Sequence, residues 1–265
     1  MSNATKYVLI TGGSAGIGFE LAKLFAKDQY NLIIVARDQQ ELDKAAAELK
    51  QSGNDVITIS RDLFNRDEAF SLCEEIEEMG LQVDVLVNDA GQGVYGLFKD
   101  NDIERELKII DLNIGALTIL TKHFLKEMVS RNEGKILNLA SIASETPGPW
   151  QAVYHGTKAY VLSLTEAIRE EVKDTEITVT ALLPGATDTD FFNKAGMQDA
   201  KIVREQSLSN PADVAKDGYE ALMAGDDKII SGFKNKVMVG MSHITPDTMV
   251  AHNMNEMQKP VEKEE

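Results

Sequence analysis

Cysteine is nearly absent from this sequence, since its 265 residues include only Cys73. A single cysteine cannot form an internal disulfide, and the helical character of its surroundings predicts that it packs rather than reacts. Long apolar runs are also lacking, because no stretch reaches the roughly 18 uninterrupted apolar residues of a membrane-spanning helix. We see no signal-peptide pattern. We therefore expect a cytoplasmic protein with no membrane partner.

Positive charge is scarce as well. The chain carries 27 lysines and arginines against 43 acidic residues, a formal net charge of −16. A nucleic-acid partner would need many basic side chains to neutralise its phosphates, so this balance argues against one. The acidity is typical of a soluble surface. With 43% apolar and 26% charged residues, the composition is that of an ordinary globular protein.

Short apolar runs alternate with longer amphipathic segments, which is the pattern of β-α units and a parallel sheet. The apolar runs are rich in valine, isoleucine and leucine with little alternation, as in strands that are buried on both faces. The predicted strands are 7–11, 31–36, 55–60, 83–88, 134–140 and 178–183. The predicted helices are 18–28, 39–52, 65–80, 103–131, 154–174 and 211–224. The expected fold class is α/β, a Rossmann-type doubly wound parallel sheet with helices on both faces.

We expect a single domain over residues 1–257, followed by a disordered acidic tail over 258–265. The helix at 103–131 is long for a globular protein, so it is expected to bend or to dock against a partner subunit.

Two glycine motifs compete for a phosphate-binding role. The literal G-x-G-x-x-G pattern occurs at 91–96, but no predicted helix opens after it. The segment 11–18, Thr-Gly-Gly-Ser-Ala-Gly-Ile-Gly, leaves a strand and runs directly into a helix. There, backbone N–H groups and the helix N-terminus can face a pyrophosphate, and glycine lets the phosphate approach. The context favours 11–18.

A Tyr-x-x-x-Lys pair occurs twice, at Tyr95/Lys99 and at Tyr154/Lys158. The first lies in a glycine-flanked, loop-like stretch. The second opens a predicted helix, where positions four apart share one face. Its companion Ser141 follows a buried strand, which would end at the same edge of the sheet as the glycine turn.

These motifs resemble the short-chain dehydrogenase/reductase family, in which one compact domain binds both cofactor and substrate. The resemblance covers nearly the whole chain, and the motifs occur in the family's order. They are 11–18, Asp62-Leu63, the segment 88–91, Asn113, Ser141, Tyr154 with Lys158, and Pro184-Gly185 followed by Thr189.

The resemblance implies hydride transfer between a nicotinamide cofactor and a carbonyl or alcohol, with Tyr154 as general acid/base. A lysine ammonium about 4 Å away is worth up to about 4 kcal/mol at an effective dielectric constant of 20, so Lys158 is expected to lower the tyrosine pKa. Lys158 would also bind the nicotinamide ribose, Ser141 would donate to the substrate oxygen, and Asn113 would tie a water-linked proton relay to the lysine. The implied cofactor-binding residues are Gly12, Ser14, Gly16, Ile17, Gly18, Arg37, Asp62, Leu63, Asn88, Ala90, Gly91, Tyr154, Lys158, Pro184, Gly185, Thr187 and Thr189.

The end of the second strand favours NADP (NADPH) over NAD, which remains the alternative cofactor. NAD-preferring relatives usually carry an acidic residue where Ala36 stands, and here Arg37 follows, which suits a 2′-phosphate. Asp38 lies near the spacing of an acidic ribose ligand, but we interpret it as the cap of the next helix.

Two positions depart from the family pattern. Asp89 replaces the second asparagine of an Asn-Asn-Ala-Gly segment, a change expected to leave the backbone contacts intact. His155 stands where a small residue is usual and is expected to face away from the site, although a second proton shuttle is the alternative. His123, His243 and His252 are too dispersed in the sequence to indicate a metal site.

The substrate is the least readable part of the sequence. Residues 189–209 should form a lid, in which Phe191, Phe192 and Met197 either line a modestly apolar pocket or only pack the lid down. Methionines gather after Met197, as core filling, an adaptable binding surface or a subunit contact.

Three functions remain open at this stage. The first is an NADP-dependent oxidoreductase acting on a small-molecule carbonyl or on a primary or secondary alcohol, as a homodimer or homotetramer. The second is a 3-oxoacyl-thioester reductase, although the acidic chain offers little basic surface for an acyl carrier. The third is a nucleotide-sensing protein, against which the intact Ser141, Tyr154 and Lys158 argue.

Overall fold

A computed structural model describes residues 6–205 and 207–261. Its middle layer is a seven-stranded parallel sheet in the order β3-β2-β1-β4-β5-β6-β7. The strands are β1 Tyr7–Thr11, β2 Asn31–Ala36, β3 Val56–Ser60, β4 Val83–Asn88, β5 Gly134–Leu139, β6 Ile177–Leu183 and β7 Lys228–Ile230. The six predicted strands are confirmed to within one residue at each end. The short, half-buried edge strand β7 was not predicted, because three residues carry too weak an apolar pattern.

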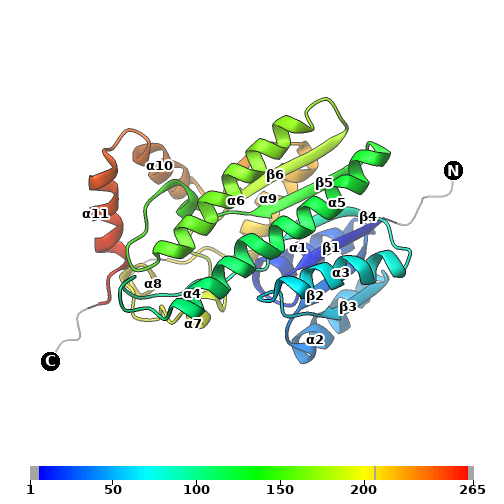
Figure 1. The fold of residues 1–265 in the computed structure, drawn as a ribbon, viewed down its shortest axis with the longest axis horizontal. Helices are drawn as coiled ribbons and strands as arrows, with labels where there is room; N and C mark the ends of the chain where they lie inside the picture. Colours follow the sequence, from blue (N-terminus) through cyan, green and yellow to red (C-terminus); the bar gives the residue numbers. More distant parts are fainter. Residues whose placement is uncertain (1–5, 206, 262–265) are drawn as a thin grey trace.

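Helices cover both faces of the sheet (Figure 1). One layer contains α1 Gly16–Lys27, α2 Gln39–Leu49 and α9 Pro211–Ala224, and the other contains α3 Arg66–Glu78, α5 Leu117–Arg131 and α6 Ala152–Glu171. The side chains of successive strand residues point to opposite faces of the sheet. Val8 and Ile10 pack against the first helix layer, and Leu9 packs against the second. The predicted Rossmann-type doubly wound fold is therefore confirmed. Cys73 is buried in the second layer, where burial raises its pKa to about 12, as expected of a packing residue.

The long helix predicted for 103–131 is interrupted. Helix α4, Ile103–Ile110, passes into a π-helical stretch, Asp111–Ala116, before α5 begins. The prediction that this segment bends has this physical basis, since a π-turn widens the helix locally and often occurs at functional positions. Asn113 lies within the widened turn and is 2% exposed.

Four helices of the C-terminal part lie toward one end of the molecule, away from β3 and α2 (Figure 1). They are the short helices α7 Phe191–Ala195 and α8 Lys201–Arg204, and the helices α10 Phe233–Ser242 and α11 Asp247–Gln258. None of these four helices was predicted, because the first two are short and the last two lack a strong apolar stripe. Among the described residues, no helix is both long enough and apolar enough to cross a membrane.

The expected disorder from residue 258 onward is wrong for 258–261. Gln258 is 2% exposed, Pro260 pairs with Ala200, and the Val261 N–H donates to the Asp199 carbonyl at 2.8 Å. The charged composition suggested a free tail, but these backbone contacts hold the segment against the lid. The remainder of that predicted tail, 262–265, lies outside the described residues.

Candidate active site

The strand order reverses between β1 and β4, and ligands of open α/β sheets bind in the crevice at such a point. The glycine turn follows β1 there. Gly12 has φ +74°, and a Cβ on it would lie 2.9 Å from Asp89 Oδ2 and 3.1 Å from the Ala90 nitrogen. Gly18 is equally restricted, because a Cβ there would lie 2.6 Å from the Gly12 carbonyl oxygen. Only glycine therefore allows this turn to pack against the end of β4.

The turn presents an open helix N-terminus to the crevice. The N-cap of α1 is Ala15, whose side chain cannot cap, and the first turn carries no acidic residue. By contrast, α2, α3, α4 and α9 each have a side-chain cap. Uncapped N–H groups and the positive end of the helix dipole form an anion-binding site, so the turn fits the pyrophosphate of a dinucleotide. The competing motif at 91–96 opens no helix, as predicted.

Ser141, Tyr154 and Lys158 line the same pocket as the glycine turn. Ser141 follows β5, where its hydroxyl accepts from the Ala143 N–H at 3.1 Å and donates to the Pro184 carbonyl at 3.3 Å. Tyr154 and Lys158 lie one turn apart on α6. The Lys158 ammonium donates to the Leu139 carbonyl at 2.7 Å and lies 5.8 Å from the centre of the Tyr154 ring.

The structure corrects the expected effect of Lys158 on Tyr154. Burial raises the pKa of Tyr154 to about 12, the hydrogen bond with Ser141 opposes that rise, and the charge of Asp89 adds to it. The sequence argument assumed an ammonium close to the hydroxyl, whereas Lys158 is engaged with Leu139. The chain by itself therefore keeps the Tyr154 phenol protonated at neutral pH.

The charge that interacts with Lys158 is Asp89. Burial raises the pKa of Asp89 to about 7, against the attraction of Lys158 and a hydrogen bond from the Gly18 N–H. Burial also lowers the pKa of Lys158 to about 8, and Asp89 opposes that change. Asp89 was expected to leave the backbone contacts of its segment intact, and no contact here contradicts that. Its side chain, which the sequence analysis did not consider, places a titrating carboxyl group between the glycine turn and the lysine.

Three predicted site residues, Asn113, Asn88 and Gly18, do not line the pocket but lie behind it. Asn113 accepts from the Gln92 N–H at 3.0 Å and donates to Thr157 Oγ1 at 3.0 Å, so it ties the loop after β4 to α6. Asn88 donates to Thr121 at 3.0 Å and to Asn138 at 2.8 Å inside the sheet. Gly18 packs under the turn.

The other predicted residues converge on the pocket. Arg37 lies over the Phe64 ring at 5.0 Å, and the Asp38 carboxylate accepts from the Gln40 and Glu41 N–H groups, which confirms Asp38 as a helix cap. The predicted residues that line the pocket are Gly12, Ser14, Gly16, Ile17, Arg37, Asp62, Leu63, Ala90, Gly91, Ser141, Tyr154, Lys158, Pro184, Gly185, Thr187 and Thr189.

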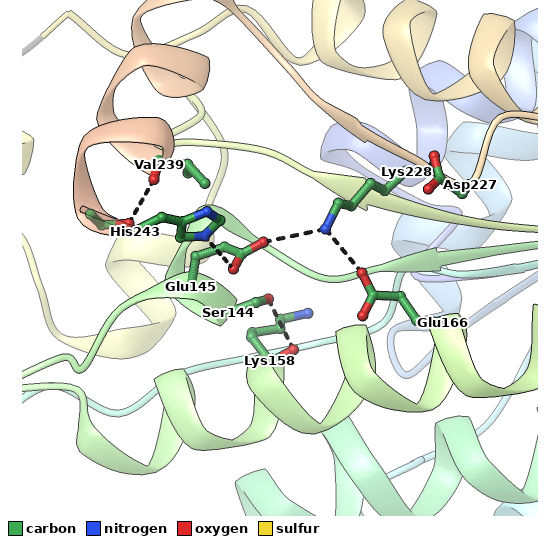
Figure 2. Close-up of polar contacts among 9 residues, drawn as sticks. Ser144, Glu145, Lys158, Glu166, Asp227, Lys228, Val239 and His243 are labelled. Carbon is green, nitrogen blue, oxygen red and sulfur yellow. Dashed lines mark hydrogen bonds and ion pairs between the residues drawn. The ribbon is translucent and has the colours of Figure 1, made fainter. Parts of the chain in front are cut away.

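A polar network anchors the segment after Ser141, the 3-10 turn Ile142–Glu145 (Figure 2). Glu145 accepts from His243, the residue that follows α10, at 3.1 Å and faces Lys228 of β7 at 3.8 Å. Lys228 also pairs with Glu166 of α6 at 2.9 Å. Ser144 donates to the Lys158 carbonyl at 2.9 Å. The serine segment is thereby fixed to three neighbouring elements.

The sequence indicated part of the far end of the pocket, since the predicted lid residues Phe191, Phe192 and Met197 line it, but it missed two other parts. His155 was expected to face away, yet it is 4% exposed and lines the pocket, where it bonds to the Thr146 carbonyl at 2.8 Å. The opposite wall comes from α10 and α11, with Met238, Met254, Met257 and Gln258. The gathering of methionines after Met197 was the only signal in the sequence for this wall.

His123 has neighbours that its position in the sequence did not indicate. Its Nε2 lies 3.2 Å from a Glu77 oxygen and 3.5 Å from a Glu127 oxygen, between α3 and α5. Within the described part of the chain, these three residues are the one group that could hold a metal ion. They lie outside the pocket.

Comparison with known proteins identifies the family. A family model described as short chain dehydrogenase matches residues 6–200. The chain is 36% identical over 185 residues to the uncharacterized oxidoreductase YvrD of Bacillus subtilis, covering 70% of each chain. It is 27% identical over 253 residues to the ketoacyl reductase HetN of Nostoc, covering 92% of this chain and 86% of that protein.

A solved structure also indicates the short-chain dehydrogenase family. A short-chain dehydrogenase from Sphingobium yanoikuyae in complex with NADPH superimposes with a TM-score of 0.81 at 27% identity, covering 94% of this chain and 99% of the other. The chain belongs to the short-chain dehydrogenase/reductase family and is an NAD(P)-dependent oxidoreductase.

Proposed function

We propose that this enzyme is an NADP-dependent oxidoreductase that interconverts a carbonyl group with a primary or secondary alcohol. The observation that carries the proposal is the convergence of Ser141, Tyr154 and Lys158 on one pocket with the glycine turn after β1. A proton donor, a hydrogen-bond donor for the reacting oxygen and an anion site for the cofactor are thus brought together.

The proposed roles follow from the groups available. The Tyr154 hydroxyl gives its proton to the carbonyl oxygen during reduction and regains it during alcohol oxidation. Ser141 exchanges its bond to Pro184 for one to that oxygen, which polarises the carbonyl. Lys158 supplies a positive charge beside the tyrosine and a donor for the nicotinamide ribose. The nicotinamide, when bound, supplies or accepts the hydride. Asn113 is a positioning residue, because it holds α6 and the loop after β4 in register.

Preference for NADP is supported by the end of β2. Ala36 offers no carboxylate to a ribose 2′-OH, and Asp38 is occupied as the cap of α2. Arg37 is exposed and lines the pocket. Its guanidinium can pair with a 2′-phosphate through charge-assisted hydrogen bonds. The NADPH complex of the similar Sphingobium enzyme supports the same choice, with NAD as the alternative cofactor.

Replacing Arg37 by alanine should raise the KM for NADPH by about 10- to 100-fold, because a hydrogen bond to a charged group contributes about 1.5–3 kcal/mol. The kcat/KM with NADH should change less than threefold. Steady-state kinetics with both cofactors measure the effect. The matched control is Lys44→Ala, which removes the same charge from the exposed side of α2. An unchanged NADPH/NADH ratio in Arg37→Ala would contradict the proposed cofactor preference.

The reaction class is tested by following NADPH absorbance against a panel of ketones, aldehydes and 3-oxoacyl thioesters. Turnover of ketones or aldehydes supports the proposal. The ketoacyl reductase from Nostoc favours a second candidate, a 3-oxoacyl-thioester reductase, which would act on the thioesters alone. Binding of NADPH without turnover of any compound would instead indicate a nucleotide-sensing protein.

We also propose a homodimer or homotetramer in the cytoplasm. Apolar side chains are exposed on the helices that cover one face of the sheet, with Ile103 and Leu107 on α4 at 58% and 45% and Tyr160 on α6 at 38%. Sedimentation of the purified protein tests the assembly.

A further inference from the structure

The substrate end of the pocket has an apolar wall. Phe191, Phe192 and Met197 contribute from the lid, and methionines contribute from α10 and α11. Methionine side chains are unbranched and adapt to irregular shapes. This wall suits a bulky, apolar skeleton rather than a small polar molecule.

Two glutamines interrupt that wall. Gln151 precedes α6 and is 5% exposed, and Gln258 ends α11 and is 2% exposed; both line the pocket. The amide nitrogen of Gln151 and the amide oxygen of Gln258 are buried with no hydrogen-bond partner in the described part of the chain. A buried polar group without a partner costs about 1–3 kcal/mol. A substrate group that accepts from the first amide and donates to the second would supply the missing partners.

His155 fixes the orientation of Gln258. Its Nδ1 lies 2.8 Å from the Thr146 carbonyl, which can only accept, so Nδ1 carries the proton. In the neutral ring Nε2 then accepts, and the Gln258 amide nitrogen donates to it at 2.9 Å. Burial lowers the pKa of His155, which keeps the ring neutral. The Gln258 amide oxygen is therefore the end left without a donor.

Both glutamines lie near the reacting tyrosine. A Cβ on Gly93 would lie 3.2 Å from the Gln151 amide nitrogen and 3.5 Å from Tyr154 Cδ2, so these two atoms lie close to one another. Gln258 reaches the same region through His155, the neighbour of Tyr154, and its backbone carbonyl accepts from the Tyr95 hydroxyl at 2.6 Å. Both amides therefore lie on the side of the pocket that carries Tyr154 and His155.

The hydrogen-bonding capacity of the two unpaired amide atoms indicates which substrate group they can bind. A donor on Gln151 and an acceptor on Gln258 together suit a hydroxyl, which accepts and donates. A carboxylate could only accept, and an ammonium could only donate. Lys194, which also lines the pocket, already pairs with Asp190 at 3.2 Å.

We propose that Gln151 and Gln258 recognise a second hydroxyl on the substrate, close to the reacting carbon of a bulky apolar hydroxyketone or diol. The inference rests on the proposed carbonyl–alcohol chemistry and names the substrate class for it. The remaining apolar wall holds the skeleton.

Matched substrates test the inference, for example 1-phenylpropan-1-one against its 2-hydroxy derivative, each reduced with NADPH. We expect kcat/KM to be at least tenfold higher for the hydroxyketone, since a site built to hydrogen-bond a hydroxyl discriminates against the analogue that lacks it. In Gln151→Met and Gln258→Met, which keep the side-chain length but remove the amide, this ratio should fall toward one. The control Gln51→Met lies on the exposed 3-10 turn after α2 and should keep the ratio.

The outcomes separate the two proposals. If neither ketone nor any member of the wider panel is reduced, the proposed function fails. If both ketones are reduced equally well, or if the preference survives both substitutions, the inference about the glutamines fails alone. Circular dichroism and NADPH fluorescence establish that each variant is folded and binds cofactor; Gln→Leu variants replace any that is not.

Discussion

Substitution of Tyr154 by phenylalanine should lower kcat by about 100- to 10,000-fold while NADPH still binds, since general acid–base catalysis contributes about that factor. The neighbouring Ser141 cannot substitute, because an aliphatic hydroxyl is a much weaker acid than a phenol and supplies only a hydrogen bond to the oxygen. Loss of the phenol leaves the carbonyl oxygen without its proton donor. Steady-state kinetics and NADPH fluorescence measure the two effects separately.

The pH dependence of this step follows from burial of the phenol. With the pKa of Tyr154 raised to about 12, the group stays protonated in the neutral range, so its donation during reduction changes little there. Alcohol oxidation needs the phenolate, whose fraction grows about tenfold per pH unit below the pKa, so that rate should rise with pH. The control Tyr160→Phe removes an exposed hydroxyl from the same helix and should keep the wild-type rate. A near wild-type rate in Tyr154→Phe would refute the assigned mechanism.

Replacing Asp89 by asparagine should stabilise the protein at pH 8 and do so progressively less at lower pH. The pKa of Asp89 is raised in the folded chain from 3.8 to about 7, so the folded state binds more protons than the unfolded state between about pH 4 and pH 7. Stability therefore falls as the pH rises through that window and stays low above it. Asparagine keeps the shape without the ionisation.

The shift in the pKa of Asp89 sets an upper limit on the gain in stability. About three pKa units correspond to at most roughly 4 kcal/mol, and about 1 kcal/mol moves the melting temperature of a chain of this size by about 2–4 °C. We expect a rise of about 3–10 °C at pH 8 and almost none at pH 4. The attraction between Asp89 and Lys158 is lost in the variant, but burial of the carboxylate is the larger contribution.

Thermal melts of wild type and variant across pH 4 to 8 measure this difference. NADPH affinity at pH 8 should also rise, because a negative charge is removed beside the glycine turn that receives the cofactor phosphates. Asp43→Asn, on the exposed face of α2, is the control and should follow the wild-type melting curve. Parallel pH profiles for wild type and Asp89→Asn would contradict the role of this carboxyl group.

The sequence predicted the part of the molecule in which local signals and tertiary structure agree. Buried parallel strands require continuous apolar runs, and a pyrophosphate turn requires glycine, so β1 to β6 and the turn at 11–18 were readable. Tyr154, Lys158 and Ser141 were found because their spacing could be combined with strand ends. The same information predicted that the segment 103–131 bends, but not that a π-turn does so.

The parts of the candidate site that the sequence did not predict depend on contacts between residues that are distant in the chain. Asn88 and Asn113 belong to motifs, and only the packed structure shows that their side chains bond within the sheet and behind the pocket. The effect of Lys158 on Tyr154 was misjudged, because the pull of the Leu139 carbonyl and the burial of Asp89 are not visible in a sequence. His155 is oriented by its hydrogen bond to Gln258 at the end of α11, and the apolar periodicity of the sequence did not predict that helix.

The pocket is built from two separate parts of the chain, and this affects how the specificity of the enzyme can change. The family model ends at residue 200, whereas the methionine wall and Gln258 come from helices beyond that point, at one end of the molecule (Figure 1). The sheet and the glycine turn contribute the other half. Mutational libraries confined to α10 and α11 can therefore sample new substrates at little risk to the sheet. Selection acting on the C-terminal helices could retarget the catalyst while its hydride chemistry stays the same.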